Sequence, residues 1–277
     1  MKMKAIFILL NAVLAVAFLV IFFSPLALLG GDWFSVFWSR NWIIAVVFLV
    51  TLGAVDAYFG LNWALFTGLE KEDWGAVVSF LEKAIYRRGL VFSGRVRLLL
   101  NAYLVTSNTE GILALEAYLA RRKPPLVGRF SIPFGIPHLL AKDPKEAETW
   151  FRKLLAAPRL SDREWVAWNH AFTLLQMKNQ YEAKTELTGL SERVTEPVLL
   201  LLTLYLLDVV ARNDTELEAQ VGRRREALAQ GQTPESFQKT IDKASTNMQV
   251  VVLARLLRDA VQWLFAGSRP AASVTIS

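Results

Sequence analysis

The sequence has 277 residues, of which 53% are hydrophobic and 20% charged, and its formal net charge is +6 at pH 7. This composition is too apolar for a disordered chain, and the length allows one or two domains. The absence of cysteine excludes a disulfide framework, a thiolate metal site and a cysteine nucleophile. Only two histidines, His138 and His170, are available for imidazole chemistry.

Two long apolar segments stand at the start of the chain. No charged residue lies between Ala5 and Gly31, and Asp56 is the only one from Asn41 to Leu69. About 20 apolar residues in a helix cross the hydrocarbon core of a bilayer. The sequence therefore predicts a transmembrane hairpin in residues 1–61, with spans at about 5–25 and 41–61 and an interfacial loop at 26–40. A cleaved signal peptide is the alternative for the first segment, but its apolar run is long and no small-x-small cleavage site follows.

The charges that flank the two spans predict their orientation. Lys2 and Lys4 precede the first span, further basic residues follow the second, and Asp32 and Arg40 cancel in the loop. By the positive-inside rule, both termini and the rest of the chain lie in the cytoplasm. We expect a two-span protein of the inner (cytoplasmic) membrane.

The loop carries an aromatic belt that we expect to contact membrane lipids. On a helix, Trp33, Phe34, Phe37 and Trp38 share one face, and Trp42 extends the belt. Such a segment is predicted to lie flat among the lipid headgroups.

Two polar residues, Asn11 and Asp56, interrupt the spans. In an antiparallel hairpin they fall at nearly one depth, where they could share a hydrogen bond. An ionisable residue in a membrane is by default a functional candidate. We favour a role in helix pairing, because Asp56 has no relay of partners and Gly53 and Ala57 have small-xxx-small spacing.

The remainder of the chain predicts helices that repeat. Apolar anchors recur with spacings of 37, 33, 36 and 34 residues, each followed four residues later by a large apolar residue; the anchors are Val77, Ala114, Ala147, Ala183 and Leu217. A period near 34 residues with paired helices is typical of tetratricopeptide repeats (TPRs).

Three stretches carry a resemblance to the TPR family. They are Glu72 to Ile85, Asp143 to Pro158 with its closing proline, and Gln180 to Ala183. The resemblance covers about residues 61–225 and implies an all-α chain: a transmembrane helical hairpin followed by a TPR-like α-solenoid at 62–230. The layout is similar to that of bacterial membrane-anchored TPR proteins, including a family associated with haem biosynthesis, and implies no pathway.

A proline-rich stretch at 124–137 is predicted to break the repeats, because proline disfavours helix. It is either a joint with Phe130 and Phe134 packed inward, which we favour, or a docking loop that exposes both rings.

No catalytic, cofactor or metal motif is found, so we expect neither an enzyme nor a bound cofactor. His170 lies on an apolar helix and is expected to be structural, and His138 is expected near the surface. Acidic pairs such as Glu146 and Glu148 are expected to be solvated, because residues two apart do not share a helical face.

Basic clusters end several predicted helices. Arg87 and Arg88 precede a glycine, where cations suit the helix dipole. The alternative is contact with anionic lipid. The clusters lack interleaved aromatic residues, so we expect no nucleic-acid partner.

A helical pair is predicted at 231–266, before a disordered tail at 267–277. Its second helix, Met248 to Phe265, has Asn247 as N-cap and Gly267 after its end. Its polar residues form one narrow stripe, so Leu256, Trp263 and Phe265 are candidates for a partner surface. The alternative is that neighbouring helices enclose them.

Together these features predict a membrane-anchored adaptor or scaffold that binds other proteins, or a second copy of the chain, in an envelope-associated assembly. The alternative is a regulatory or assembly subunit of an integral membrane complex (a transporter, secretion or motor machine) that acts through the hairpin.

Overall fold

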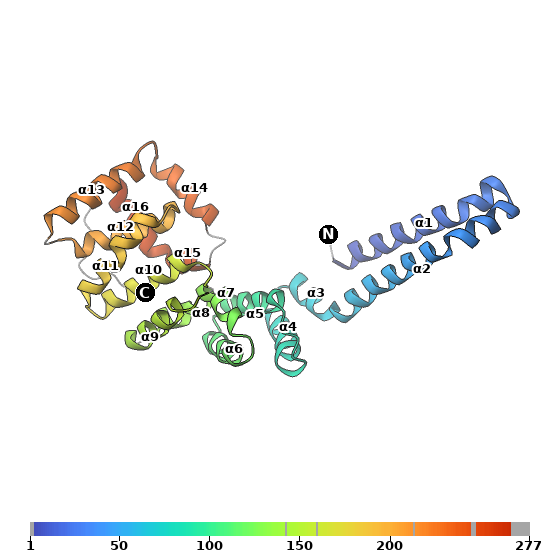
Figure 1. The fold of residues 1–277 in the computed structure, drawn as a ribbon, viewed down its shortest axis with the longest axis horizontal. Helices are drawn as coiled ribbons and strands as arrows, with labels where there is room; N and C mark the ends of the chain where they lie inside the picture. The colour runs from blue at the N-terminus through green and yellow to red at the C-terminus, as the bar shows by residue number, and fades with distance from the viewer. Residues whose placement is uncertain (1–2, 142, 159, 213, 245–247, 267–277) are drawn as a thin grey trace. The chain divides into compact units, whose positions relative to one another are not determined.

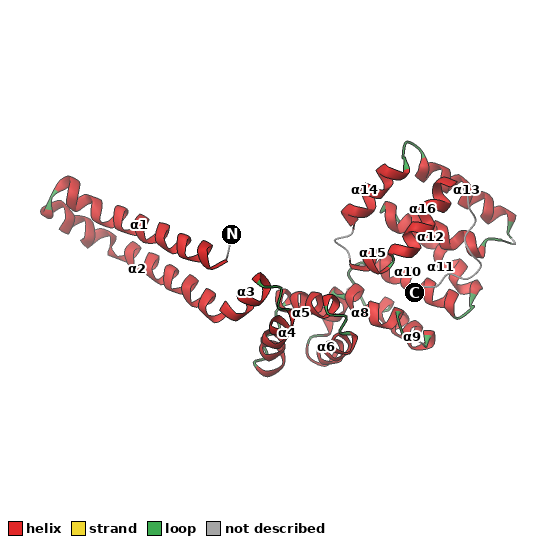
Figure 2. Ribbon diagram, turned by 180° about the vertical axis from the view of Figure 1, so that it is seen from behind, coloured by secondary structure: helices red, strands yellow, loops and turns green. Residues whose placement is uncertain are grey.

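The structure is a computed structural model that describes residues 3–141, 143–158, 160–212, 214–244 and 248–266. Every regular element in this described part is a helix, so the prediction of an all-α chain is confirmed (Figure 2). The chain forms two compact units, residues 1–106 and 107–277, and each is described by itself.

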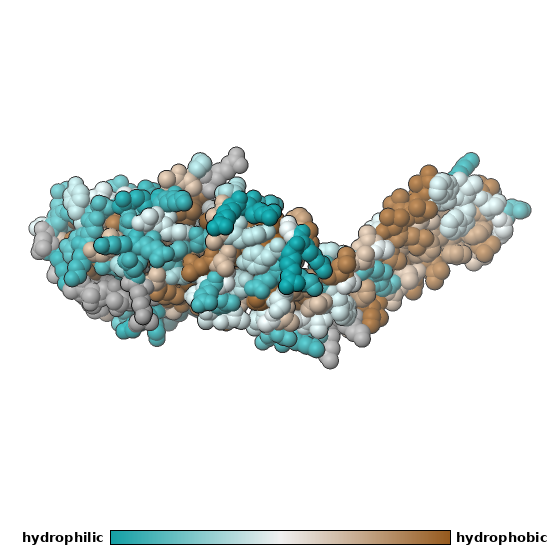
Figure 3. All heavy atoms as spheres, turned by 90° about the horizontal axis from the view of Figure 1, so that it is seen from below, coloured by the Kyte–Doolittle hydropathy of each residue, from teal (hydrophilic) through white to brown (hydrophobic). Residues whose placement is uncertain are grey.

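The first unit begins with a helical hairpin in which α1 (Met3–Leu29) and α2 (Gly31–Leu61) lie side by side (Figure 1). Gly30 links them with a φ of 85°, a backbone conformation that glycine adopts at little cost. Both helices are long and apolar enough to cross a membrane, as predicted. Hydrophobic side chains cover the sides of the hairpin in Figure 3.

Aromatic pairs set the register of the hairpin. The rings of Phe7 and Phe59 are 5.1 Å apart, and those of Phe18 and Phe48 are 5.4 Å apart. The two contacts are 11 residues apart on both helices and in opposite chain directions, so α1 and α2 form an antiparallel pair. This register brings Asn11 to the level of Val55 and Asp56.

The segment expected as an interfacial loop at 26–40 continues the two long helices and is interrupted only at Gly30. Helix α1 continues past Pro25 to Leu29, and α2 starts at Gly31 and runs without a break through the expected start of the second span. The sequence from Asp32 to Leu52 contains neither glycine nor proline, so nothing interrupts the helix. The 31 residues of α2 extend over about 46 Å, which exceeds the thickness of a hydrocarbon core.

Three short helices and one π-helical turn complete the first unit: α3 (Trp63–Glu70), α4 (Trp74–Glu82), η1 (Lys83–Arg87) and α5 (Ser93–Val105). Helix α3 contacts both α1 and α2, which is why this unit extends beyond residue 61. A Cβ atom on Gly68 would lie 2.9 Å from Cγ2 of Val77, so only glycine permits this approach of α3 to α4.

The second unit contains the remaining helices: α6 (Thr109–Arg122), α7 (Pro124–Arg129), α8 (Ser131–Leu139), α9 (Pro144–Leu155), α10 (Arg163–Gln176), α11 (Gln180–Arg193), α12 (Pro197–Val210), α13 (Thr215–Ala229), α14 (Pro234–Ala244), α15 (Met248–Val252) and α16 (Ala254–Ala266). From α8 to α13, each helix packs on the next one along the chain. Their buried side chains form one hydrophobic core that extends to α16.

A capping residue recurs along the chain with a nearly constant spacing. The side chain of an Asp or Asn accepts a hydrogen bond from a backbone N–H in the first turn of α4, α6, α9, α11 and α13. These caps are 35, 35, 36 and 35 residues apart; they are Asp73, Asn108, Asp143, Asn179 and Asp214. Each cap starts the helix by satisfying an otherwise unpaired N–H group.

The caps correct one of the five expected anchors. Val77, Ala147 and Ala183 are buried, and each lies four residues after its cap, while Leu217 is buried three residues after its own cap. Ala114, however, is exposed. Its place is taken by Ile112, which lies four residues after Asn108 and is 1% exposed. The buried anchor of this repeat therefore lies two residues before the expected one.

The C-terminal helices pack back on earlier helices. Helix α15 contacts α8, and α16 contacts α12 and α13 (Figure 1). The buried amides of Asn169 on α10 and Gln249 on α15 are hydrogen-bonded to one another. The single helix expected at 248–265 is divided at Leu253. The expected cap Asn247 and the tail at 267–277 lie outside the described residues.

Candidate binding site

Glu116 occupies a helix position that is apolar in neighbouring repeats. The eighth residue after the cap is Leu81 on α4, Phe151 on α9 and Leu187 on α11, and each of these is 0% exposed. In α6 the same position holds Glu116, whose side chain is 15% exposed. A charged group at a core position requires compensating partners.

Two donors from the following helices meet the carboxylate of Glu116. Trp150 Nε1, on α9, donates to Oε1 at 2.5 Å. His138 Nε2, on α8, lies 3.0 Å from Oε2. The rings of His138 and Trp150 stack with their centroids 4.5 Å apart. His138 is buried, although the sequence suggested a surface position. Both oxygens of Glu116 are thus engaged, and the contact fixes the Trp150 ring.

A surface cavity of about 420 Å³ lies beside this carboxylate, and we call it the Glu116 pocket. It falls within the size range of small-molecule sites. Helices α6, α7 and α9 and the turn after α9 form its walls. Its lining is mostly apolar and consists of Glu116, Ala120, Pro124, Pro125, Val127, Gly128, Trp150, Lys153, Leu154, Ala157 and Pro158.

The proline-rich stretch forms one wall of the pocket. It forms two short helices, α7 and α8, which are separated at Phe130. Pro124 and Pro125 occupy the first turn of α7, where proline is tolerated. The backbone N–H of Ser161 donates to the carbonyl of Gly128, which joins α7 to the segment between α9 and α10. Phe130 and Phe134 are buried, in agreement with the inward-packed alternative.

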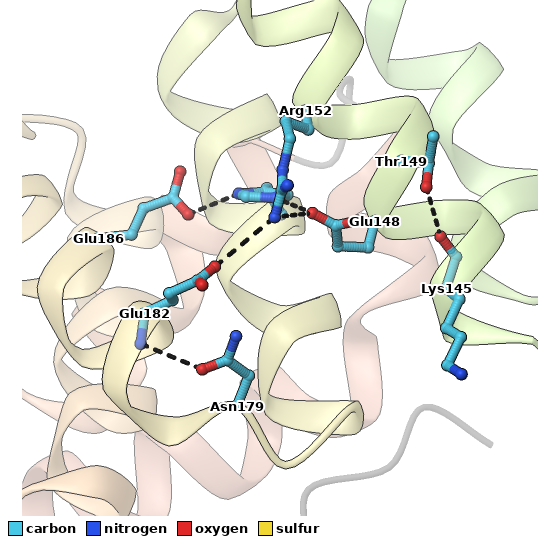
Figure 4. A network of polar contacts seen from close by, with 8 residues as sticks. Lys145, Glu148, Thr149, Arg152, Asn179, Glu182 and Glu186 are labelled. Carbon is cyan, nitrogen blue, oxygen red and sulfur yellow. Dashed lines mark hydrogen bonds and ion pairs between the residues drawn. The ribbon is translucent and has the colours of Figure 1, made fainter.

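A second polar cluster joins α9, α10 and α11 (Figure 4). His170 Nδ1 lies 2.6 Å from Oε2 of Glu186, and its Nε2 lies 3.3 Å from Oε1 of Glu148. Arg152 approaches Glu148 at 2.5 Å and Glu182 at 3.6 Å. Glu148 is buried, so the expectation that it is solvated is wrong. Its partner histidine comes from α10, which the spacing of the acids along α9 does not indicate.

The two carboxylates control the charge of His170. Burial lowers the pKa of this histidine, but the hydrogen bonds and negative charges of Glu186 and Glu148 raise the pKa by more, so the net shift is upward. The cluster therefore favours the imidazolium form and holds three helices together, as expected for a structural histidine.

Comparison with known proteins places this arrangement in a family. Residues 111–266, more than half of the chain, match a family model described as "Uncharacterised Treponema protein". The chain belongs to this Treponema family. A relative from Treponema pallidum (strain Nichols), described as "Uncharacterized protein", is 26% identical over 281 residues, which cover 96% of this chain and 88% of the relative. No solved structure matches the chain.

The part shared with the Treponema family contains both polar sites. The Glu116 pocket and the His170 cluster lie within residues 111–266, whereas the hairpin lies before them. The match to the T. pallidum relative covers 96% of the chain and so includes most of the hairpin as well.

The polar residues of the two long apolar helices, Asn11 and Asp56, share a level without a hydrogen bond between them. Asn11 Nδ2 donates to the carbonyl of Phe7 in its own helix, at 3.2 Å. Among the described residues, Oδ1 of Asp56 is buried and has no hydrogen-bond partner. The amide of Asn11 thus bonds to the backbone of its own helix and not to Asp56.

The expected aromatic belt is split between two faces of α2. Trp33 and Trp42 are exposed, but Phe34, Phe37 and Trp38 are half-buried. Trp38, for example, lies 5.7 Å from Phe22 of α1. Because α2 is continuous here, one side of this segment packs on α1, and the five rings do not form one lipid-facing surface.

The remaining candidate residues divide into exposed and buried sets. Arg87 and Arg88 are exposed at the end of η1. Leu256 and Trp263, however, are 4% and 1% exposed, and Phe265 is half-buried. Trp263 packs 5.9 Å from Tyr205 and donates from Nε1 to Asp208 at 3.1 Å. The proposed partner surface is thus part of the core, because α12 and α13 enclose α16.

Neither Glu116 nor Trp150 is among the residues that the sequence predicts to be functional. Glu116 could be identified by counting from the Asp and Asn caps. The eighth residue after the cap is apolar in α4, α9 and α11, but eight residues after Asn108 it is an acid. Trp150 had no comparable signal, because a tryptophan on an amphipathic helix is ordinarily part of a core.

Proposed function

We propose that this protein is a membrane-anchored adaptor, in which a TPR-like array of helix pairs binds protein partners in an envelope-associated assembly. The recurrence of Asx caps every 35 or 36 residues, behind two apolar helices, is the observation that carries the proposal. Stacked helix pairs serve as binding surfaces in repeat proteins. The charge asymmetry around the spans supports a cytoplasmic position for the array in the inner membrane.

The C-terminal helices limit where partners can bind. Because α15 and α16 already cover parts of α8, α12 and α13, those surfaces are not free. Exposed positions remain on the second helix of each pair. Tyr181 on α11, for example, is 82% exposed.

A photocrosslinking experiment on the full chain tests the adaptor role. A photoreactive phenylalanine at Tyr181 would be activated in the native membrane, and its adducts identified by mass spectrometry. The matched control carries the same group at exposed Lys239 on α14. We expect a defined protein adduct at Tyr181. This adduct should persist when residues 1–61 are replaced by an unrelated two-span hairpin. Adducts with lipid alone at both positions would refute the proposal.

A second candidate is a regulatory or assembly subunit of a membrane complex that acts through the hairpin. The observation in its favour is Asp56, whose Oδ1 is buried without a hydrogen-bond partner in the described part of an apolar hairpin. Ionisable groups in such positions are commonly functional. Under this alternative, hairpin replacement or Asp56→Leu abolishes the adducts, whereas the adaptor proposal predicts that both changes leave them intact.

A further inference from the structure

Two charged side chains line the Glu116 pocket, and only one of them already has partners within the part of the protein that the structure describes. The lining contains two charged side chains, Glu116 and Lys153, among apolar ones. Both oxygens of Glu116 already have partners, the indole N–H of Trp150 and the imidazole of His138. A cationic ligand would have to compete with these contacts. Glu116 therefore holds Trp150 in the wall of the pocket and is not free to bind a ligand.

Lys153 is the group that remains available. It is exposed on α9, and no ion pair joins it to any residue that the structure describes. Its neighbour Arg152 is engaged with Glu148 and Glu182. An ammonium group at the edge of an apolar cavity attracts an anion whose remaining surface is apolar.

The walls of the pocket favour a small ligand over an extended peptide. Pro124, Pro125 and Pro158 have no backbone N–H, so this lining cannot pair with a peptide backbone as a sheet edge does. A ligand here gains its affinity by burying an apolar body against Val127, Leu154 and the proline rings.

We propose that the Glu116 pocket binds a small amphipathic carboxylate, with its apolar body in the cavity and its carboxylate beside Lys153. The cavity of about 420 Å³ accommodates a body such as a phenylalkyl group. This site is independent of the adaptor role, because it requires no protein partner and no membrane anchor.

Three probes that differ only in their head group test the proposal. The full chain in phosphatidylcholine nanodiscs would be titrated with 4-phenylbutyrate, 4-phenylbutanol and 4-phenylbutylamine. Saturation-transfer NMR reports binding, and empty nanodiscs give the background. We expect the carboxylate to bind about two- to fivefold more tightly than the alcohol, the range for a solvent-exposed ion pair. The amine is expected to bind most weakly.

Two kinds of variant separate the charge from the cavity. Lys153→Gln is expected to remove the preference for the carboxylate and leave the affinity for the alcohol unchanged. Ala157→Trp fills the cavity and is expected to abolish binding of all three probes. Ala120→Trp, at an exposed lining position on α6, gives a second test that does not depend on Ala157. Circular dichroism verifies that each variant is folded.

Several outcomes would overturn the proposal. Tightest binding of the amine would assign the ligand contact to Glu116. Unchanged binding in both folded tryptophan variants would place the probe elsewhere. Binding no stronger than to empty nanodiscs would show that the cavity does not take this class of ligand. A crosslinked protein partner at Tyr181 could still be found in each case, so the adaptor role is judged separately.

Discussion

The indole N–H of Trp150 donates to Oε1 of Glu116 at 2.5 Å, across a separation of 34 residues. One repeat of the chain lies between the two residues. In the neighbouring repeats, the position of Glu116 is filled by Leu81, Phe151 and Leu187, which pack by apolar contact. Here a polar contact joins α6 to α9 instead, and it forms one side of an apolar pocket.

Removal of the Glu116 carboxylate is expected to destabilise the second unit. Glu116→Ala leaves the N–H donors of buried His138 and half-buried Trp150 without this acceptor, which costs about 1–3 kcal/mol for a group that stays unsatisfied. Glu116→Gln keeps one acceptor oxygen and is expected to cost less. Urea unfolding of the full chain, followed by circular dichroism, measures both. An equal effect of the two substitutions would show that the acceptor is unimportant.

The stability contributed by His170 is expected to fall as the pH rises. Because the pKa of His170 is raised in the folded state, its contribution is complete below the unfolded value of about 6.5. It is lost as the pH rises through the higher folded pKa. His170→Gln is expected to cost about 1.5–3 kcal/mol at pH 6, as for hydrogen bonds to charged groups.

The comparison of the wild-type chain with His170→Gln isolates this effect. Urea unfolding of both proteins at pH 6 and at pH 9 gives the difference in the free energy of unfolding at each pH. The difference is expected to shrink at pH 9. A difference that is the same at both values would mean that the histidine is neutral throughout and only fills space.

Helix α16 is expected to behave as part of the core. Trp263→Glu removes a buried ring and its hydrogen bond to Asp208, and it places a carboxylate beside that acid. Arg225, whose guanidinium lies 5.5 Å from the centre of the Trp263 ring, offsets part of the charge, so we expect a cost of about 3–5 kcal/mol, as for a buried tryptophan-to-alanine change. Val251→Glu is the matched control, because Val251 is 52% exposed on neighbouring α15. Thermal unfolding distinguishes the two. A folded Trp263→Glu protein would restore the idea of a partner surface.

The topology of the hairpin can be tested because the chain lacks cysteine. Ser35, near the start of α2, and Ser79, on α4, are both exposed. With both termini in the cytoplasm, a membrane-impermeant maleimide is expected to label Ser35→Cys but not Ser79→Cys in spheroplasts. Permeabilised cells, where both should react, provide the control. Labelling of Ser79→Cys alone would reverse the proposed orientation.

The hairpin register predicts which pairs of cysteines can react. The contacts of Phe7 with Phe59 and of Phe18 with Phe48 place Asn11 at the level of Asp56. Asn11→Cys with Asp56→Cys is therefore expected to crosslink readily with a short bis-reactive reagent. Asn11→Cys with Ala45→Cys is expected to remain unlinked, because these positions are several helical turns apart. Gel mobility reports the outcome, and equal crosslinking of both pairs would exclude this register.

The sequence by itself determined the helical class and the two long apolar helices. Both depend on local properties: a predominantly apolar composition in residues 5–28 and 31–61, and apolar residues at three- and four-residue steps beyond. The Asx caps also lie in the sequence with their 35-residue spacing, since a cap needs only the backbone of its own first turn.

Tertiary structure alone decided which polar groups meet. Glu116 finds Trp150 and His138, and His170 finds Glu148 and Glu186, across 16 to 34 residues. The spacing of charged residues within one helix does not predict which residues of other helices they contact. Trp263 likewise has an amphipathic pattern that fits either a partner surface or a core. Only the return of α16 to α12 buries the ring, because burial depends on which helices the chain brings together.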